Sequence, residues 1–134
     1  MNYLSGKIIF KHSISIGDQV YTYPKEYLLL CHFLSSDLRS ITGVDYFLRN
    51  VKESFAETGI YDRSIAQNTG EIYIDNSITK FSEDFFKETT EQNFYLETDL
   101  FFEIITLWRQ FLVDVQLESF TIDVEELRAS LNGG

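Results

Sequence analysis

The segment LETDLFFEIITLWRQFLVD, residues 96–114, constrains the fold more than any other part of the chain. From Asp99 onward its apolar residues recur at the spacing of one helix face. They are Leu100, Ile104, Leu107, Trp108, Phe111, Leu112 and Val115. Polar residues lie on the opposite face, and Thr98 is placed to cap the helix. Because Trp108 falls on the apolar stripe, we predict that it fills the core and that its indole N–H finds one buried acceptor.

The length and composition predict one domain. A chain of 134 residues that is 44% apolar can bury an independent core. We therefore predict a single domain over residues 1–134, with residues 131–134 as a fraying tail. The only cysteine, Cys31, allows no internal disulfide and suits a reducing compartment. The first residues turn polar without forming a leader, and the longest apolar run, YLLLCHFL, is too short to span a membrane, so we expect a cytoplasmic protein.

The N-terminal segment GKIIFKHSISIGDQVYTYP has the pattern of a β-hairpin. Apolar or aromatic side chains alternate with polar ones from Ile8 to Ile16, and they are Ile8, Phe10, His12, Ile14 and Ile16. Gly17 and Asp18 supply a turn, and residues 20–23 suit a returning strand. Pro24 stands where a helix can begin.

The remaining pattern alternates helices and strands. We predict helices over 25–41 (ended by Gly43), 44–59, 99–115 and 123–131, with Asp123 and Glu126 forming a capping-box-like start to the last one. Strands are predicted over 71–76, 94–98 and 117–122, and a loop over 60–70. The pattern over 78–93 leaves helix and strand open, and we predict a short helix there. The elements do not form regular βαβ units, so the predicted class is α+β. In this fold an antiparallel sheet with an N-terminal hairpin packs against three to five helices.

The sequence contains no combination of residues that is typical of a particular catalytic reaction. Cys31 and His32 are adjacent, and neighbouring side chains diverge by about 100° on a helix, so they cannot pair as thiolate and imidazole. The seven glycines form no phosphate-binding loop. Two histidines twenty residues apart and one cysteine do not make a zinc set, and no calcium loop is present. We therefore expect no catalytic residues, no metal site, no cofactor and no enzymatic activity.

The charge distribution indicates which class of partner the protein can bind. The net charge is −10, and residues 1–67 sum to zero, so residues 68–134 carry all of it. Phosphate binding needs a positive surface, which argues against nucleic acid and against an anionic membrane as direct ligands. A basic protein partner fits the charge better. An acidic surface also serves solubility alone, and that alternative stays open.

The acidic residues fall into two predicted strips of one binding surface. The first would lie on a helix over residues 82–92, and the second follows residue 94. The predicted partner-binding residues are Asp84, Glu88, Glu91, Tyr95, Glu97, Asp99 and Glu103. Phe86, Tyr95 and Phe101 are candidate apolar anchors, because a few buried aromatics supply most of the binding energy of an interface.

In size, charge and the late FFEIITLWRQFL segment, residues 101–112, the chain resembles bacterial immunity proteins. These are the partners of contact-dependent-inhibition and other polymorphic toxins. The resemblance implies a protein that binds the toxic C-terminal domain of a cognate effector, often a nuclease, and blocks its active site. The resemblance does not identify any individual binding residue in this chain. A monomer is favoured, although the sequence leaves the oligomeric state open.

Two other classes of function remain. A secretion chaperone or adaptor is also small and acidic, and it would expose a long apolar groove or edge strand through which it dimerises. An enzyme that uses carboxylates to hold magnesium is the other alternative, and added magnesium would then raise the melting temperature. A mimic of DNA with a different protein target is a variant of the immunity hypothesis.

Overall fold

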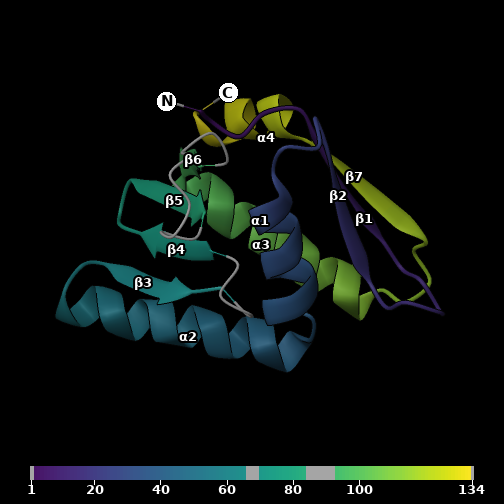
Figure 1. The fold of residues 1–134 in the computed structure, drawn as a ribbon, viewed down its shortest axis with the longest axis horizontal. Coiled ribbons are helices and arrows are strands. Elements are labelled where there is room, and N and C mark those ends of the chain that lie inside the picture. Colours follow the sequence, from purple (N-terminus) through teal and green to yellow (C-terminus); the bar gives the residue numbers. More distant parts are fainter. Residues whose placement is uncertain (1, 66–69, 84–92, 134) are drawn as a thin grey trace.

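Within residues 2–65, 70–83 and 93–133, which the computed structural model describes, seven strands form two antiparallel sheets. Together with the helices they make one α+β domain, as predicted. The strands expected in one sheet are divided between two. Figure 1 shows the four-stranded sheet on the left and the three-stranded sheet on the right, with α1 and α3 between them.

The three-stranded sheet joins the two ends of the chain. Its strands are β1 (Lys7–Lys11), β2 (Gln19–Tyr23) and β7 (Ser119–Asp123), in the order β2-β1-β7. The hairpin and the late strand are therefore confirmed, but the alternation does not continue to Ile16. Ile14 and Ile16 lie beyond the end of β1 and are fully and 67% exposed, respectively. A hydrogen bond from the backbone N–H of Gly17 to the carbonyl of Ser13 closes this connection into turns.

The four-stranded sheet corrects two predictions. Its strands are β3 (Tyr61–Ser64), β4 (Gly70–Ile74), β5 (Ile78–Glu83) and β6 (Phe94–Glu97), in that order. The loop predicted over 60–70 contains β3, and the helix predicted over 78–93 begins as β5. Thr79 and Phe81 are fully buried at a spacing of two, which is a strand pattern that the helical spacing of Ile78 and Phe81 concealed.

The helices are α1 (Leu28–His32), the π-helix η1 (Phe33–Asp37), α2 (Ile41–Glu57), α3 (Thr98–Val113) and α4 (Val124–Leu131). The predicted helix over 25–41 thus begins later and ends as η1. Gly43 does not end it, because Gly43 lies in the first turn of α2, where its N–H donates to the Ser40 side chain. Gly59, with φ +79°, follows the end of α2 as predicted.

Two helix starts differ in how they are capped. Asp123 accepts a hydrogen bond from the Glu126 N–H at 3.0 Å, which confirms the predicted cap of α4. Thr98 is not the cap of α3, because it is the first helical residue and Glu97 precedes it. The Thr98 hydroxyl instead donates to the Asp75 carbonyl at 2.8 Å, which ties the helix start to the β4–β5 turn. Since α4 includes Leu131, the predicted tail overlaps its last residue.

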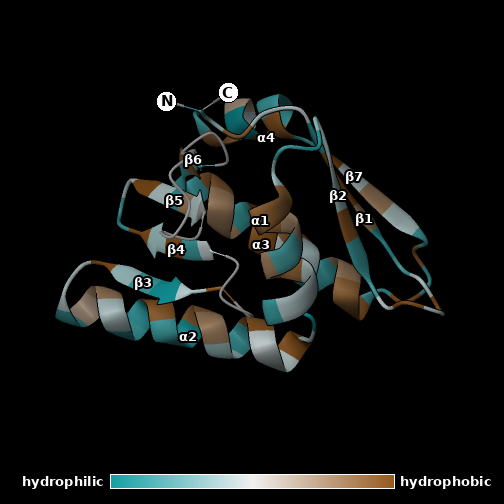
Figure 2. Ribbon diagram, in the orientation of Figure 1, coloured by the Kyte–Doolittle hydropathy of each residue, from teal (hydrophilic) through white to brown (hydrophobic). Residues whose placement is uncertain are grey.

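The core lies between the sheets and around α3. Trp108 is completely buried, and its ring meets Phe10 of β1 edge-on at 4.9 Å. Phe33 of η1 contacts Phe47 and Phe81 in the same way, which joins α2 to the four-stranded sheet. Figure 2 shows the alternation of apolar and polar residues along α2. None of the helices that the structure describes is both long and apolar enough to cross a membrane.

Candidate functional site

The structure describes four of the seven predicted partner-binding residues. Asp84, Glu88 and Glu91 lie outside the described residues, as does the predicted anchor Phe86. Tyr95 and Glu97 are in β6, whereas Asp99 and Glu103 are in α3. The prediction that Phe101 is an apolar anchor is wrong: it is completely buried and packs against Phe33, Phe47 and Phe81.

Glu97 and Asp99 line a pocket of about 280 Å³ where β6 passes into α3. The strand ends with Glu97, and the helix begins at once, so the two carboxylates flank the first residue of α3. Acidic groups are stabilised at a helix N-terminus by the helix dipole. The β4–β5 turn and α4 complete the lining, whose members are Asn76, Ser77, Glu97, Asp99, Leu100, Arg128, Leu131 and Asn132.

Arg128 of α4 fixes one wall of this pocket. Its Nε donates to Glu97 Oε2 at 2.6 Å, its Nη1 to Glu125 at 2.8 Å, and its Nη2 to the Leu4 carbonyl at 2.8 Å. The guanidinium therefore ties α4 both to β6 and to the N-terminal segment. Burial alone would lower the pKa of Arg128, but the hydrogen bonds to the two glutamates raise it. Its positive charge is therefore paired by contacts inside the protein.

The pocket keeps acceptors that the protein does not satisfy. Glu97 Oε1 is buried, and no described residue donates a hydrogen bond to it. Burial would raise the pKa of Glu97, but the hydrogen bond from Arg128 outweighs burial and lowers it, so the group is a carboxylate at neutral pH. Asp99 is exposed, and the described residues offer it no ion-pair or hydrogen-bond partner. The pocket contains two carboxylates, and the Arg128 guanidinium is already bound by internal contacts. A cationic hydrogen-bond donor is therefore the favoured ligand.

Tyr95 and Glu103 lie beside this pocket and are not part of its lining. Tyr95 is two residues before Glu97, so both side chains are on the same face of β6. The Lys80 ammonium lies 5.7 Å from the centre of the Tyr95 ring, and the Tyr3 ring lies 6.2 Å from it. Glu103 is half-buried, one helical turn beyond Asp99. The structure therefore brings Glu97 and Asp99 together in one pocket, whereas Tyr95 and Glu103 lie outside its lining.

Sequence reasoning missed Arg128, Asn76, Ser77 and Asn132. A partial signal for Arg128 existed, since it is the only basic residue after Arg109 and lies three residues after Glu125. Its contact with Glu97, 31 residues away, has no local signature. The turn residues carry a typical motif, because the Asp75 carboxylate accepts from the N–H groups of Ser77 and Ile78.

The Cys31 thiol and the His12 imidazole lie away from this pocket. Burial raises the pKa of the Cys31 thiol, which is 7% exposed and donates toward Thr22. His12 lies at the end of the three-stranded sheet, with Nδ1 2.7 Å from an oxygen of Asp18. Among the residues that the structure describes, no three His, Cys, Asp or Glu side chains are grouped to hold a metal ion. The thiol and the His12 imidazole are therefore not part of the pocket lining.

Comparison of the chain with protein-family models, curated proteins and solved structures gave no match.

Proposed function

We propose that this protein is an inhibitor that binds a basic protein, as immunity proteins bind the toxic domain of a cognate effector. One observation carries the proposal: the pocket between β6, α3 and α4 exposes the Asp99 carboxylate next to Glu97, while Arg128 is occupied by internal contacts. A lysine or arginine side chain of the partner supplies a donor to Asp99. It enters next to Asp99, whose carboxylate is exposed.

The charges around the pocket extend the same preference. Glu103 on α3 and Glu126 on α4 add carboxylates for which no ion pair exists within the described part of the chain. Arg109, the one basic residue of α3, binds both oxygens of Asp45 at 2.8 and 2.9 Å. The charges of Arg109 and Arg128 are therefore neutralised inside the protein, and the remaining carboxylates attract a basic partner during encounter. A nuclease is such a partner, because it must carry a positive surface to grip phosphates.

The test uses the product of the gene immediately upstream in the native host as the candidate toxin. Surface plasmon resonance at about 50 and about 300 mM salt should show association that slows as salt screens the charges. Asp99→Asn should lower the association rate and reduce its salt dependence. Glu53→Gln, an exposed change on α2, is the matched control and should leave both unchanged. Equal effects of the two variants would show that the pocket is not the interface.

A growth assay tests the inhibitory role separately. Expression of the toxin domain should stop growth, and co-expression of this protein should restore it. Binding without rescue would make the protein a carrier of the toxin rather than its inhibitor.

A secretion chaperone or adaptor is the second candidate, because one end of the molecule exposes several aliphatic side chains. They lie in the connection that follows β1 and at the end of α3 with the connection after it, and they are Ile14, Ile16, Val113, Val115 and Leu117. Exposed apolar groups on neighbouring segments are typical of protein-binding surfaces. The chaperone hypothesis predicts a dimer in solution, whereas an immunity protein can act as a monomer. Analytical ultracentrifugation distinguishes the two.

A further inference from the structure

The outer edge of β2 carries backbone groups that the fold leaves unpaired. Hydrogen bonds at the two ends of the β1–β7 ladder, from His12 N–H to Glu118 and from Val124 N–H to Gly6, are 3.1 and 2.9 Å long. In an antiparallel ladder, successive residues point their backbone groups to opposite sides. The even-numbered residues of β1 therefore face β7, and its odd-numbered residues face β2.

The register then decides which residues of β2 face outward. Ile9 pairs with Tyr21, so the backbone groups of Tyr21 point toward β1. The N–H and C=O groups of Val20 and Thr22 consequently point away from β1, and no described residue forms a backbone hydrogen bond with them. An added strand would find donors and acceptors at this edge in the alternation it needs.

A groove of about 320 Å³ runs along this edge. One side is β2 itself. The other is a face of the α1–η1 helical segment, because its lining residues Leu28, Cys31, His32 and Ser35 recur at helical spacing. Val20, Thr22 and Cys31 are buried, so they form the floor.

The sides of the groove remain open to solvent. Tyr21, Tyr23 and Leu28 are 43%, 53% and 55% exposed, respectively. An unpaired edge flanked by exposed aromatic and aliphatic side chains is a site for strand addition, which proteins otherwise block. The groove therefore has the two parts of a peptide-binding site: a backbone edge for affinity and side-chain contacts for selection.

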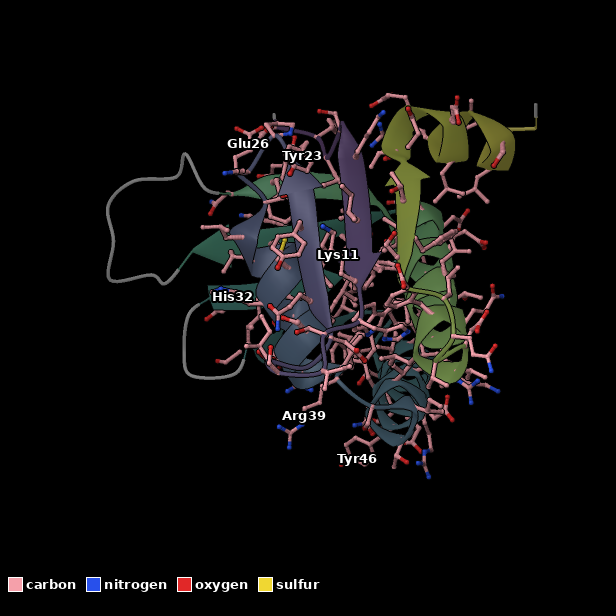
Figure 3. All side chains as sticks on the ribbon, turned by 90° about the vertical axis from the view of Figure 1, so that its right-hand side faces the viewer. Lys11, Tyr23, Glu26, His32, Arg39 and Tyr46 are labelled. Carbon is pink, nitrogen blue, oxygen red and sulfur yellow. The ribbon has the colours of Figure 1, made fainter. Side chains whose placement is uncertain are left out.

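The charge at the groove is opposite to that of the whole protein. Its lining includes Lys25 and His32 and contains no carboxylate. The Lys11 ammonium lies 5.6 Å from the centre of the Tyr21 ring, on the outer face of the same sheet. Figure 3 shows Lys11, Tyr23, His32 and Arg39 on this side of the molecule, with Glu26 at one end. A chain of net charge −10 thus keeps a basic, tyrosine-rich strip here.

We propose that the β2 edge binds an extended acidic peptide segment of a second partner, which pairs with Val20 and Thr22 as an added strand. Its carboxylates face Lys11 and Lys25, and its apolar side chains enter the groove beside Leu28. This surface is separate from the acidic pocket and takes a partner of the opposite charge.

The binding experiment uses three fluorescein-labelled heptapeptides in anisotropy titrations with the full chain. A peptide of alternating Glu and Val should bind. The same peptide with alternate amides N-methylated on its pairing edge should bind roughly tenfold more weakly or worse, since at least two hydrogen bonds are lost. An alternating Lys and Val peptide should not compete. Equal affinity of the methylated peptide would rule out strand pairing.

A second measurement locates the peptide on the protein. Amide hydrogen exchange of Val20 and Thr22 should slow when the Glu and Val peptide is added, because their N–H groups become hydrogen-bonded. Lys25→Glu should weaken binding about fivefold, as expected for an exposed charge contact, whereas Lys52→Glu on α2 should not. Unchanged exchange at both amides, or equal effects of the two lysine variants, would overturn the proposal.

Discussion

The indole N–H of Trp108 donates a hydrogen bond of 2.7 Å to the carbonyl oxygen of Leu38, 70 residues earlier in the chain. Leu38 follows η1, and its own N–H bonds the Phe33 carbonyl at 3.0 Å. Both side chains are buried, so this hydrogen bond is shielded from water. It connects the middle of α3 to the junction between η1 and α2, and it satisfies a carbonyl that no regular helix or strand pairs.

Two substitutions of Trp108 should separate the contribution of its packing to stability from that of its hydrogen bond. Trp108→Phe keeps an aromatic ring but leaves the Leu38 carbonyl without its donor, which should cost about 1–3 kcal/mol plus the loss of packing. Trp108→Ala also opens a cavity and should cost at least about 3–5 kcal/mol. Urea unfolding followed by circular dichroism measures both. A Trp108→Ala protein of native stability would contradict the core assignment.

Arg128 should contribute to stability through Glu97 rather than through Glu125. Arg128→Gln leaves the half-buried Glu97 carboxylate without its guanidinium partner and should lower the free energy of unfolding by about 1–3 kcal/mol. Glu125→Gln removes only an exposed pair within one helix and should cost less than about 0.5 kcal/mol. Equal losses in thermal or urea unfolding would show that the Glu97 contact contributes little.

The same contact predicts how stability changes in acid. Because the pKa of Glu97 is lowered in the folded protein, its stabilising contribution is complete above the pKa of the unfolded chain. It is lost as the pH falls through the lower folded value. Unfolding measured between about pH 6 and pH 3 should therefore show a smaller loss of stability for Glu97→Gln than for the original protein.

His12 should titrate above its usual range. Burial alone would lower its pKa, but the hydrogen bonds and charge of Asp18 and the Asp114 carbonyl outweigh burial and raise it. Its contribution to stability is therefore complete below about pH 6.5 and is lost as the pH rises through the folded pKa. NMR titration of the ring should give a pKa above 6.5, and Asp18→Asn should lower it. An unchanged pKa in that variant would exclude Asp18 as the cause.

Gly70 at the start of β4 should tolerate no side chain. A Cβ atom there would lie 2.5 Å from the Ser82 carbonyl oxygen and 2.9 Å from Leu29. Gly70→Ala must move the backbone of β5 and should cost about 1–3 kcal/mol. Glu71→Ala, next to it on the exposed face, should change the free energy of unfolding by less than about 0.5 kcal/mol. Denaturant midpoints of the two variants give the comparison.

The elements that could be predicted were those whose pattern is local. Trp108 lies on a long apolar stripe, and Asp123 precedes a helix with an acid three residues later, so both roles follow from spacing. β3 could not be found this way, because its sequence YDRS has one apolar residue facing the core. The strand depends on pairing with β4 and on Arg63, whose guanidinium lies 3.2 Å from the Asp37 carboxylate.

The candidate site was predicted in part for the same reason. Glu97 and Asp99 precede a strong helix, so the acidic entry to α3 is visible in the sequence. The pocket they line also needs Arg128 and the β4–β5 turn, which reach it only through the tertiary fold. The basic strip along β2 was not predicted from the sequence. Residues 1–67 have no net charge, and that sum conceals a local excess of lysine and tyrosine.

The pairing of β1 with β7 places residues 7–11 beside residues 119–123. During synthesis the first hairpin leaves the ribosome long before its third strand exists. Until then the backbone groups of Ile8 and Phe10, which pair with β7, have no partner strand. The domain can therefore close only after β7 has emerged, and premature termination anywhere before residue 119 would leave an open sheet that invites aggregation or proteolysis.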